Sequence, residues 1–94
     1  MYVKKFGNKL KYSIEFIGCG FQEHYTTTFK NGYGVSIIRS LLSYGGEDGL
    51  YEIAITNKSG EIIYDKFESH DVLGFLDEHE VEQVINEVKF FKSP

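Results

Sequence analysis

The sequence predicts an α+β domain: an antiparallel β-meander of four to five strands with a C-terminal α-helix packed on one face. Apolar and polar residues alternate with a period of two over much of residues 9–67, and glycine-rich turns separate the alternating segments. After residue 76 the apolar residues recur at the period of a helix instead. The 94 residues suffice for a single domain, residues 1–94, with a modest core.

The first two predicted strands, residues 9–17 and 21–30, form a hairpin. Both segments alternate, and the Thr-rich, aromatic composition of the second favours a strand. Glycines on both sides of Cys19 indicate a tight turn between them. In the first strand one face is expected to carry Leu10, Tyr12, Ile14 and Phe16, and the other Lys9, Lys11, Ser13 and Glu15.

A third strand is predicted over residues 33–39, because Asn31-Gly32 favours a type I′ hairpin turn with positive φ at both positions. Residues 40–43 either extend this strand or form an irregular edge. The glycine-rich residues 44–49 are expected to form a loop, followed by a fourth strand over residues 50–56. In this fourth strand Tyr51, Ile53 and Ile55 share one face.

Two shorter elements are expected before the helix. Residues 57–60 fit a type I turn closed by a glycine in the left-handed region, and they lead into a fifth strand over residues 61–67. Asp71 is placed to cap a short helical turn over residues 72–76.

The C-terminal helix is predicted from its capping signals and its apolar stripe. Asp77 and Glu80 have the spacing of a capping box, and Leu76 and Val81 that of a hydrophobic staple. We expect aromatic residues on both sheet faces, so the face without the helix is expected to need a partner or a second copy as cover. The stripe comprises Val81, Val84, Ile85, Val88 and Phe91.

Charge is distributed unevenly along the chain. The net charge is −4, with +4 in residues 1–46 and −8 in residues 47–94. This balance argues against a general nucleic-acid binder, which needs a basic face to displace counterions. The acidic second half is suited to attract a basic partner; the alternative is a solvated acidic helix beside a basic sheet edge.

Composition also bounds the cellular setting. No apolar run is long enough to span a membrane, and the lysines near the N-terminus precede no apolar segment of a signal peptide, so a cytoplasmic location is expected. Cys19 is the single cysteine, which excludes an internal disulfide and a cysteine-rich zinc site.

The sequence contains no recognisable catalytic motif. His24, His70 and His79 lack metal-ligand spacing, and His70 beside Asp71 is at most half of a metal site. No G-x-S-x-G context surrounds any of Ser36, Ser40, Ser43, Ser59, Ser69 and Ser93. The glycine-rich segments lack the spacing of phosphate-binding loops. We therefore expect a non-enzymatic protein without metal or cofactor.

Two alternatives to a protein-binding role stay open. One is a homo-oligomeric structural or assembly component, such as a homodimer formed through an edge strand or the uncovered sheet face. The other is a single-stranded nucleic-acid-binding protein, against which the acidic second half argues. Its stacking residues would be Tyr25, Tyr33, Tyr44 and Tyr51, and its phosphate-binding residues Lys4, Lys5, Lys9 and Lys11.

Three segments carry a resemblance to other proteins: NGYGVS at residues 31–36, YGG..GLYE at residues 44–52, and DVLGFL followed by EV at residues 71–81. The chain from Asn31 to the C-terminal helix resembles short uncharacterised proteins encoded by tailed bacteriophages and prophages. The resemblance implies a role during infection of a bacterium, in which the protein binds, and modulates or inhibits, a host or phage protein. It implies no catalytic residue.

The surface expected to bind this partner combines the glycine-rich loop with the start of the helix. Aromatic anchors flanked by charge suit protein interfaces. The residues expected on this surface are Tyr44, Glu47, Asp48, Tyr51, Glu78 and Glu82.

Overall fold

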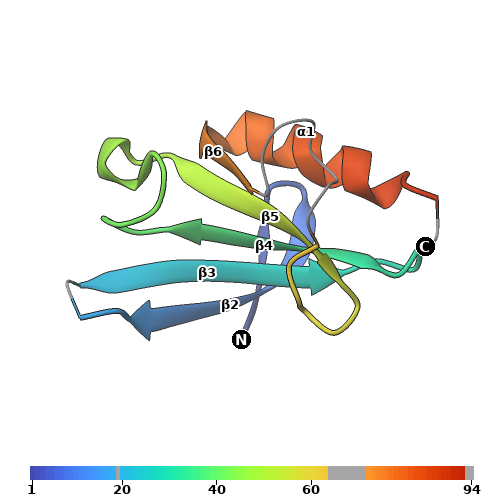
Figure 1. The fold of residues 1–94 in the computed structure, drawn as a ribbon, viewed down its shortest axis with the longest axis horizontal. Helices are drawn as coiled ribbons and strands as arrows, with labels where there is room; N and C mark the ends of the chain where they lie inside the picture. Colours follow the sequence, from blue (N-terminus) through green and yellow to red (C-terminus); the bar gives the residue numbers. More distant parts are fainter. Residues whose placement is uncertain (19, 64–71, 93–94) are drawn as a thin grey trace.

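The computed structural model describes residues 1–18, 20–63 and 72–92. It is a six-stranded antiparallel sheet whose strands follow their chain order, with one helix packed on it (Figure 1). The predicted α+β class and the meander are confirmed, whereas the number of strands is six rather than four to five. The elements are β1 (Tyr2–Lys5), β2 (Asn8–Phe16), β3 (Phe21–Thr28), β4 (Tyr33–Arg39), the 3₁₀ turn η1 (Gly46–Asp48), β5 (Tyr51–Asn57), β6 (Val72–Leu76) and α1 (Glu78–Lys89).

Strand β1 is missing from the sequence-based prediction. It is only four residues long, so it offers too little alternation to be recognised. Phe6 (φ 52°) and Gly7 (φ 73°) both have positive φ and join β1 to β2, as a type I′ turn requires. The ring of Phe6 packs edge-on against Tyr25 and Tyr51, at centroid distances of 5.4 and 5.0 Å. This burial stabilises a backbone conformation that an aromatic residue seldom adopts.

The turn at Asn31-Gly32 differs from the type I′ turn predicted for it. Gly32 alone of the two residues has positive φ, 90°. The amide of Gly32 donates to the carbonyl of Phe29 (3.1 Å), and the amide of Phe29 donates to the carbonyl of Tyr33 (2.7 Å). These bonds define a three-residue loop with a glycine bulge. The turn predicted at residues 57–60 is confirmed, with Gly60 at φ 86° and its amide bonded to the carbonyl of Asn57.

Strand β6 replaces the helical turn predicted over residues 72–76. These residues pair with β5 at the edge of the sheet. The backbone hydrogen bonds of that pairing outweigh the helical preference indicated by the local spacing of the apolar residues. The fifth strand predicted over residues 61–67 is also wrong in its described part, where Ile62 forms a single bridge to Thr56. Residues 64–67 and the predicted cap at Asp71 lie outside the described residues.

Helix α1 begins with the predicted capping box. The Asp77 carboxylate accepts a hydrogen bond from the Glu80 amide (2.8 Å), and the Glu80 carboxylate accepts one from the Asp77 amide (3.0 Å). Phe91, the last residue of the predicted stripe, packs edge-on against Tyr33 at 5.5 Å. The residues of the stripe that are buried within α1 are Val81, Val84, Ile85 and Val88.

The other end of α1 is bound by a residue from the hairpin between β3 and β4. The Asn31 side-chain amide donates to the carbonyl of Val88 (2.8 Å) and to that of Phe91 (3.1 Å). Its carboxamide oxygen accepts the Tyr33 amide at 3.1 Å. Asn31 therefore satisfies carbonyls that the end of a helix leaves without an intrahelical partner.

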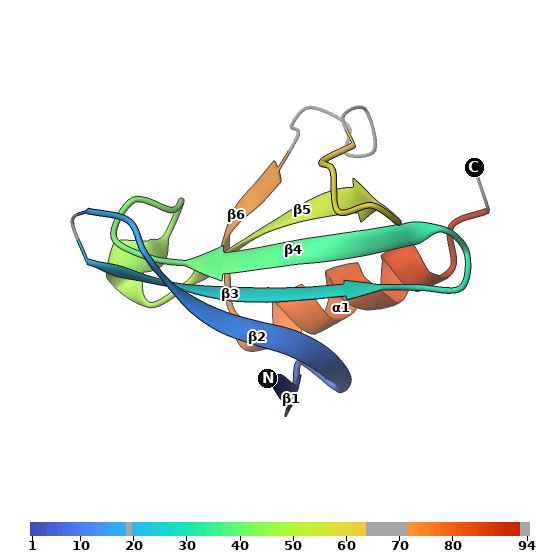
Figure 2. The same ribbon diagram turned by 90° about the horizontal axis from the view of Figure 1, so that it is seen from below.

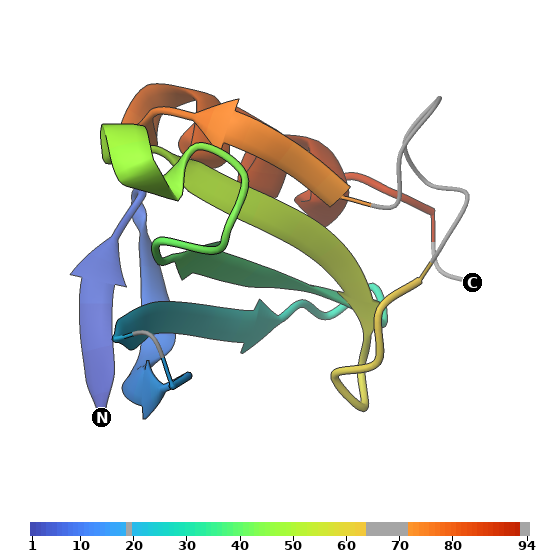
Figure 3. The same cartoon turned by 60° about the vertical axis from the view of Figure 1, so that its left-hand side comes forward.

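The two faces of the sheet differ in composition. Helix α1 covers one of them, which we call the covered face (Figure 2). The sheet is strongly curved from β1 to β6 (Figure 3). Lys5 of β1 forms an ion pair with Glu78 of α1 at 3.2 Å. One row of residues in register across β2–β5 on the covered face is Tyr12, Tyr25, Ile37 and Ile53.

The opposite face of β2–β5, which we call the open face, is rich in hydroxyl and charged groups. One row of residues in register across β2–β5 on this face consists of Lys11, Thr26, Ser36 and Ala54. The aromatic residues expected on both faces thus lie on the covered face of these strands. A polar face of this kind can lie in water, so the reason for expecting a cover over it is removed.

Candidate functional site

The loop between β4 and β5 lies at the same end of the molecule as the start of α1 (Figure 1). Gly45 (φ 89°) and Gly49 (φ 76°) flank η1 in the left-handed region, which closes the loop tightly. The Leu50 amide donates back to the carbonyl of Gly45 at 2.9 Å. Arg39, the last residue of β4, donates to the carbonyl of Gly49 at 3.1 Å. The loop is therefore hydrogen-bonded both within itself and to the sheet.

The loop is also joined to β6. The Phe75 amide donates to the carbonyl of Tyr44 at 3.1 Å. The Tyr44 side chain lies against Gly74, where an added Cβ would come within 2.4 Å of the Tyr44 Cβ. Both rings are exposed, Tyr44 by 62% and Phe75 by 59%. Phe75 has φ 58°, so the backbone is strained at the residue that presents one of these rings.

A cavity of about 480 Å³ lies between this loop and the first turn of α1. Lys5, Arg39 and His79 are among its lining residues. The Arg39 guanidinium lies 4.5 Å from the centre of the Tyr51 ring and forms two hydrogen bonds, of 2.6 and 3.1 Å, with Glu23. Together with the pair between Lys5 and Glu78, these contacts join β1, β3, β4 and α1 at this end.

The charged groups around the cavity are compensated locally. Burial raises the pKa of Glu23, but hydrogen bonds from Arg39 and Tyr25 outweigh it, so the pKa lies below its ordinary value. Burial likewise lowers the pKa of Lys5, but hydrogen bonds with Glu78 and Tyr51 outweigh it and raise the pKa. These partly exposed ion pairs therefore hold the loop and the helix in place, while Glu47 and Asp48 add exposed carboxylates to the loop.

The structure brings together part of the surface predicted from the sequence. Tyr44, Glu47 and Asp48 are exposed in the loop, and Glu78 lines the cavity beside it. Tyr51 is 2% exposed and belongs to the core, so its ring is not available as an exposed anchor.

Two further differences concern α1 and β6. Glu82 lies one turn further along α1, where its carboxylate approaches Gly7 of the turn between β1 and β2. The structure adds Phe75 to the surface. Phe75 was not predicted for this surface, because the spacing of residues 72–76 favours a helical turn, whereas these residues form strand β6 at the edge of the sheet.

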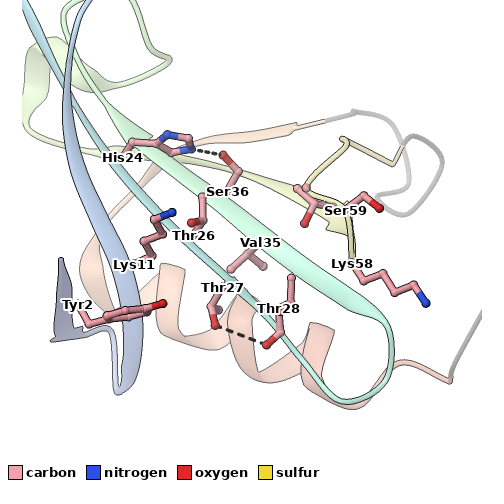
Figure 4. Close-up of a pocket in the computed structure, with 12 residues that line it drawn as sticks. Tyr2, Lys11, His24, Thr26, Thr27, Thr28, Val35, Ser36, Lys58 and Ser59 are labelled. Atoms are coloured by element: carbon pink, nitrogen blue, oxygen red, sulfur yellow. Dashed lines mark hydrogen bonds between the residues drawn. The ribbon is translucent and has the colours of Figure 1, made fainter.

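A second cavity, of about 370 Å³, lies on the open face (Figure 4). Hydroxyl groups of Thr26, Ser36 and Thr56 contribute to its lining. Lys11 and Lys58 lie on opposite sides of it. The cavity thus combines hydroxyl groups with two cationic side chains.

Three side chains on the open face form a hydrogen-bonded relay. His24 Nδ1 lies 2.9 Å from Glu15 Oε2, and His24 Nε2 lies 2.8 Å from Ser36 Oγ. Gln22 donates to the other carboxylate oxygen of Glu15 at 2.9 Å. The hydrogen bond with His24, followed by that from Gln22, lowers the pKa of Glu15. Because an ionised carboxylate only accepts, Nδ1 donates to Glu15. In the neutral imidazole Nε2 then carries the free lone pair, and the Ser36 hydroxyl donates to it.

The register of three neighbouring strands creates this relay. His24 of β3 lies opposite Ser13 of β2 and Ile38 of β4, so it reaches diagonally to Glu15 and to Ser36. No local motif marks Ser36 as a nucleophile, so it could not be distinguished from the other serines by its neighbours in the sequence. The alternation of each strand places Glu15, His24 and Ser36 on the same face of the sheet. Their proximity follows only once the register of the three strands is known.

The structure also bears on the nucleic-acid alternative and on metal binding. The rings of Tyr25, Tyr33 and Tyr51 are at most 3% exposed, so these three tyrosines are not available to stack on bases. Among the described residues, no cluster of three or more histidine, cysteine or acidic side chains could hold a metal ion. Cys19 and the pair His70 and Asp71 lie outside those residues.

Comparison with known proteins finds no match to the chain among family models, curated proteins or solved structures. In the part of the chain that the structure describes, no helix has the length and apolar character needed to cross a membrane. The side-chain arrangements at the two sites are therefore the basis for assigning a function.

Proposed function

We propose that this chain is a small phage-type protein that binds, and modulates, a host or phage protein during infection. The binding surface is the loop–helix end, which we define as Tyr44 to Asp48, Phe75 and the first turn of α1. One observation supports it most: Tyr44 and Phe75 expose their rings from backbones that are hydrogen-bonded to each other. Two of the three segments that resemble phage proteins meet at this end in their described parts, residues 44–52 and 72–81.

The physical properties of this end suit a protein interface. Exposed aromatic rings supply large contact areas at a small cost in side-chain entropy. The hydrogen bonds from Arg39 and Phe75 order the loop before binding, which reduces the cost of ordering it on contact. Glu47 and Asp48 add two exposed carboxylates at the rim. The partner surface is accordingly expected to be basic with an apolar centre.

A capture experiment with surface variants tests this proposal. The immobilised chain is exposed to a nuclease-treated bacterial lysate, and the retained proteins are identified by mass spectrometry. We expect one stoichiometric partner that the wild type retains at moderate salt. The double variants Tyr44→Ala/Phe75→Gly and Glu47→Lys/Asp48→Lys should each lose it. Glu78 stays unchanged, because reversing its charge would also break the pair with Lys5.

Two matched controls lie away from the loop–helix end. Phe16→Ala removes an exposed aromatic ring from the β2–β3 hairpin, and Glu87→Lys reverses an exposed charge near the end of α1. Both variants should retain the partner. Capture of the same partner by all four variants would show that this end is not the binding surface.

A further inference from the structure

The open face carries an arrangement that binding at the loop–helix end does not use. Ser36 Oγ lies 2.8 Å from one nitrogen of His24, and Glu15 lies 2.9 Å from the other. A serine hydroxyl becomes a nucleophile when a neighbouring base removes its proton and a third group orients that base. We infer that Ser36 is such a nucleophile, and that the open-face cavity cleaves small esters that carry a carboxylate.

The three residues have distinct roles. Ser36 and His24 are the catalytic residues, since both touch the reacting atoms, with His24 Nε2 accepting the Ser36 proton. Glu15 is a positioning residue, because it binds His24 Nδ1 and keeps the basic lone pair on Nε2. Gln22 holds the second oxygen of Glu15 in turn. This connectivity defines a nucleophilic relay whatever the fold that carries it.

Access to Ser36 depends on the small side chains around it. Its partners in register are Thr26 and Ala54, and Gly34 is the next residue of β4 on the same face. The surrounding cavity of about 370 Å³ is of a size that holds a small molecule. Lys11 and Lys58 line it on opposite sides, which favours a substrate with an anionic end (Figure 4).

The reaction balances with water as the only co-substrate. Ser36 Oγ forms a bond to the ester carbonyl carbon as its proton passes to His24 Nε2. The alkoxide leaves with that proton as an alcohol, and the acyl group stays on Ser36. Water then attacks the acyl carbon, gives its proton to His24, and releases the carboxylic acid while the proton returns to Ser36. Lys11 and Thr26, which line the cavity, are donors available to the developing oxyanion.

Covalent labelling of the full chain tests this inference. The protein is incubated with an alkyl fluorophosphonate, which bonds its phosphorus to an activated serine oxygen and releases fluoride. The adduct is counted by intact mass spectrometry and located by peptide mapping. We expect one adduct at Ser36, no adduct with Ser36→Ala, and labelling about 100-fold slower with His24→Ala. Ser13→Ala, a serine of the same face directly opposite His24, should label at the wild-type rate.

The role of Glu15 and the choice of substrate need separate readouts. Glu15→Ala should slow labelling about tenfold or more and should change the ¹⁵N signals of the His24 ring from one tautomer to a mixture. Wild-type protein should hydrolyse mono-4-nitrophenyl succinate faster than 4-nitrophenyl acetate, and Lys58→Gln should remove this preference.

Circular dichroism establishes that each variant is folded before labelling is compared. Labelling of Ser36→Ala at the wild-type rate would overturn the inference. Wild-type labelling no faster than that of the urea-unfolded chain would overturn it as well. Partner capture by the loop–helix end is measured separately, so either proposal can fail alone.

Discussion

The covered and open faces of the sheet are built from alternate residues of the same strands, yet they differ sharply in composition. Ile37 and Ile38 are neighbours in β4; the first is fully buried beneath α1, and the second is half-buried on the open face. The covered face gathers the aromatic and aliphatic core. The open face carries the relay of Ser36, His24 and Glu15.

The difference shows which part of a small domain can change its side chains without losing the stability of the fold. Burial of apolar side chains on the covered face supplies most of the stability of such a fold. The polar contacts of the open face are partly solvated and contribute little net stability. The open face can therefore hold a reactive arrangement without weakening the core.

The largest expected effect contrasts a phenylalanine in a turn with one at the end of a strand. Phe6 is buried between Tyr25 and Tyr51, whereas Phe16 is 74% exposed at the β2–β3 hairpin. Phe6→Ala should lower the free energy of unfolding by about 3 to 5 kcal/mol, because it leaves a cavity in the core. Phe16→Ala should lower it by less than about 1 kcal/mol. Urea unfolding followed by circular dichroism measures both, and similar losses would contradict the contrast.

A smaller loss of stability is expected when the contact between the β3–β4 hairpin and the end of α1 is removed. Asn31→Ala removes the hydrogen bonds to the carbonyls of Val88 and Phe91. The free energy of unfolding should fall by about 1 to 3 kcal/mol. Lys30→Ala, at the exposed preceding residue, is the control and should have almost no effect. Equal stability of the Asn31 variant and the control would show that this cap does not stabilise the helix.

The smallest effect concerns two carboxylates, one on each face. The pKa values of Glu15 and Glu23 in the folded chain lie below their ordinary value of 4.5. The unfolded chain therefore binds more protons in this range, so stability is present above pH 4.5 and is lost as pH falls through the folded-state pKa values.

Glu23 should account for more of this acid sensitivity than Glu15, because its side chain is 28% exposed and that of Glu15 is 42% exposed. Unfolding free energies measured between pH 2 and 7 should therefore depend less on pH in Glu23→Gln than in Glu15→Gln. The reverse order would indicate that the open-face relay stabilises the fold more than the ion pair at the edge of the core.

Local patterns were sufficient to predict β2 to β5 and α1. Their alternation and helical spacing extend over at least seven residues, and the capping box at Asp77 and Glu80 is a contact between near neighbours. Strand β1 was too short to recognise. Strand β6 was misread because Val72, Leu73 and Leu76 fit a helical spacing until the edge of β5 is available for pairing.

The two sites depend on contacts between residues that are far apart in the sequence, which local spacing does not indicate. The side chain of Asn31 bonds to carbonyls near residue 90, which no local pattern indicates. Glu15, His24 and Ser36 meet only once the register of two hairpins is set. The loop residues Tyr44, Glu47 and Asp48 could be predicted as exposed because glycine-rich loops lie at the surface. Their neighbour Phe75 could not, since its position follows from β6.

The matched pair Ile37→Ala and Ile38→Ala tests the division between the two faces most directly. The two substitutions delete the same atoms from adjacent residues of one strand, so differences in the unfolded chain are small. Urea unfolding should show a loss of about 2 to 5 kcal/mol for Ile37→Ala and about 1 kcal/mol or less for Ile38→Ala. Equal losses, or a larger loss for Ile38→Ala, would contradict the central claim that the covered face carries the stability of the fold and leaves the open face available for the proposed reaction.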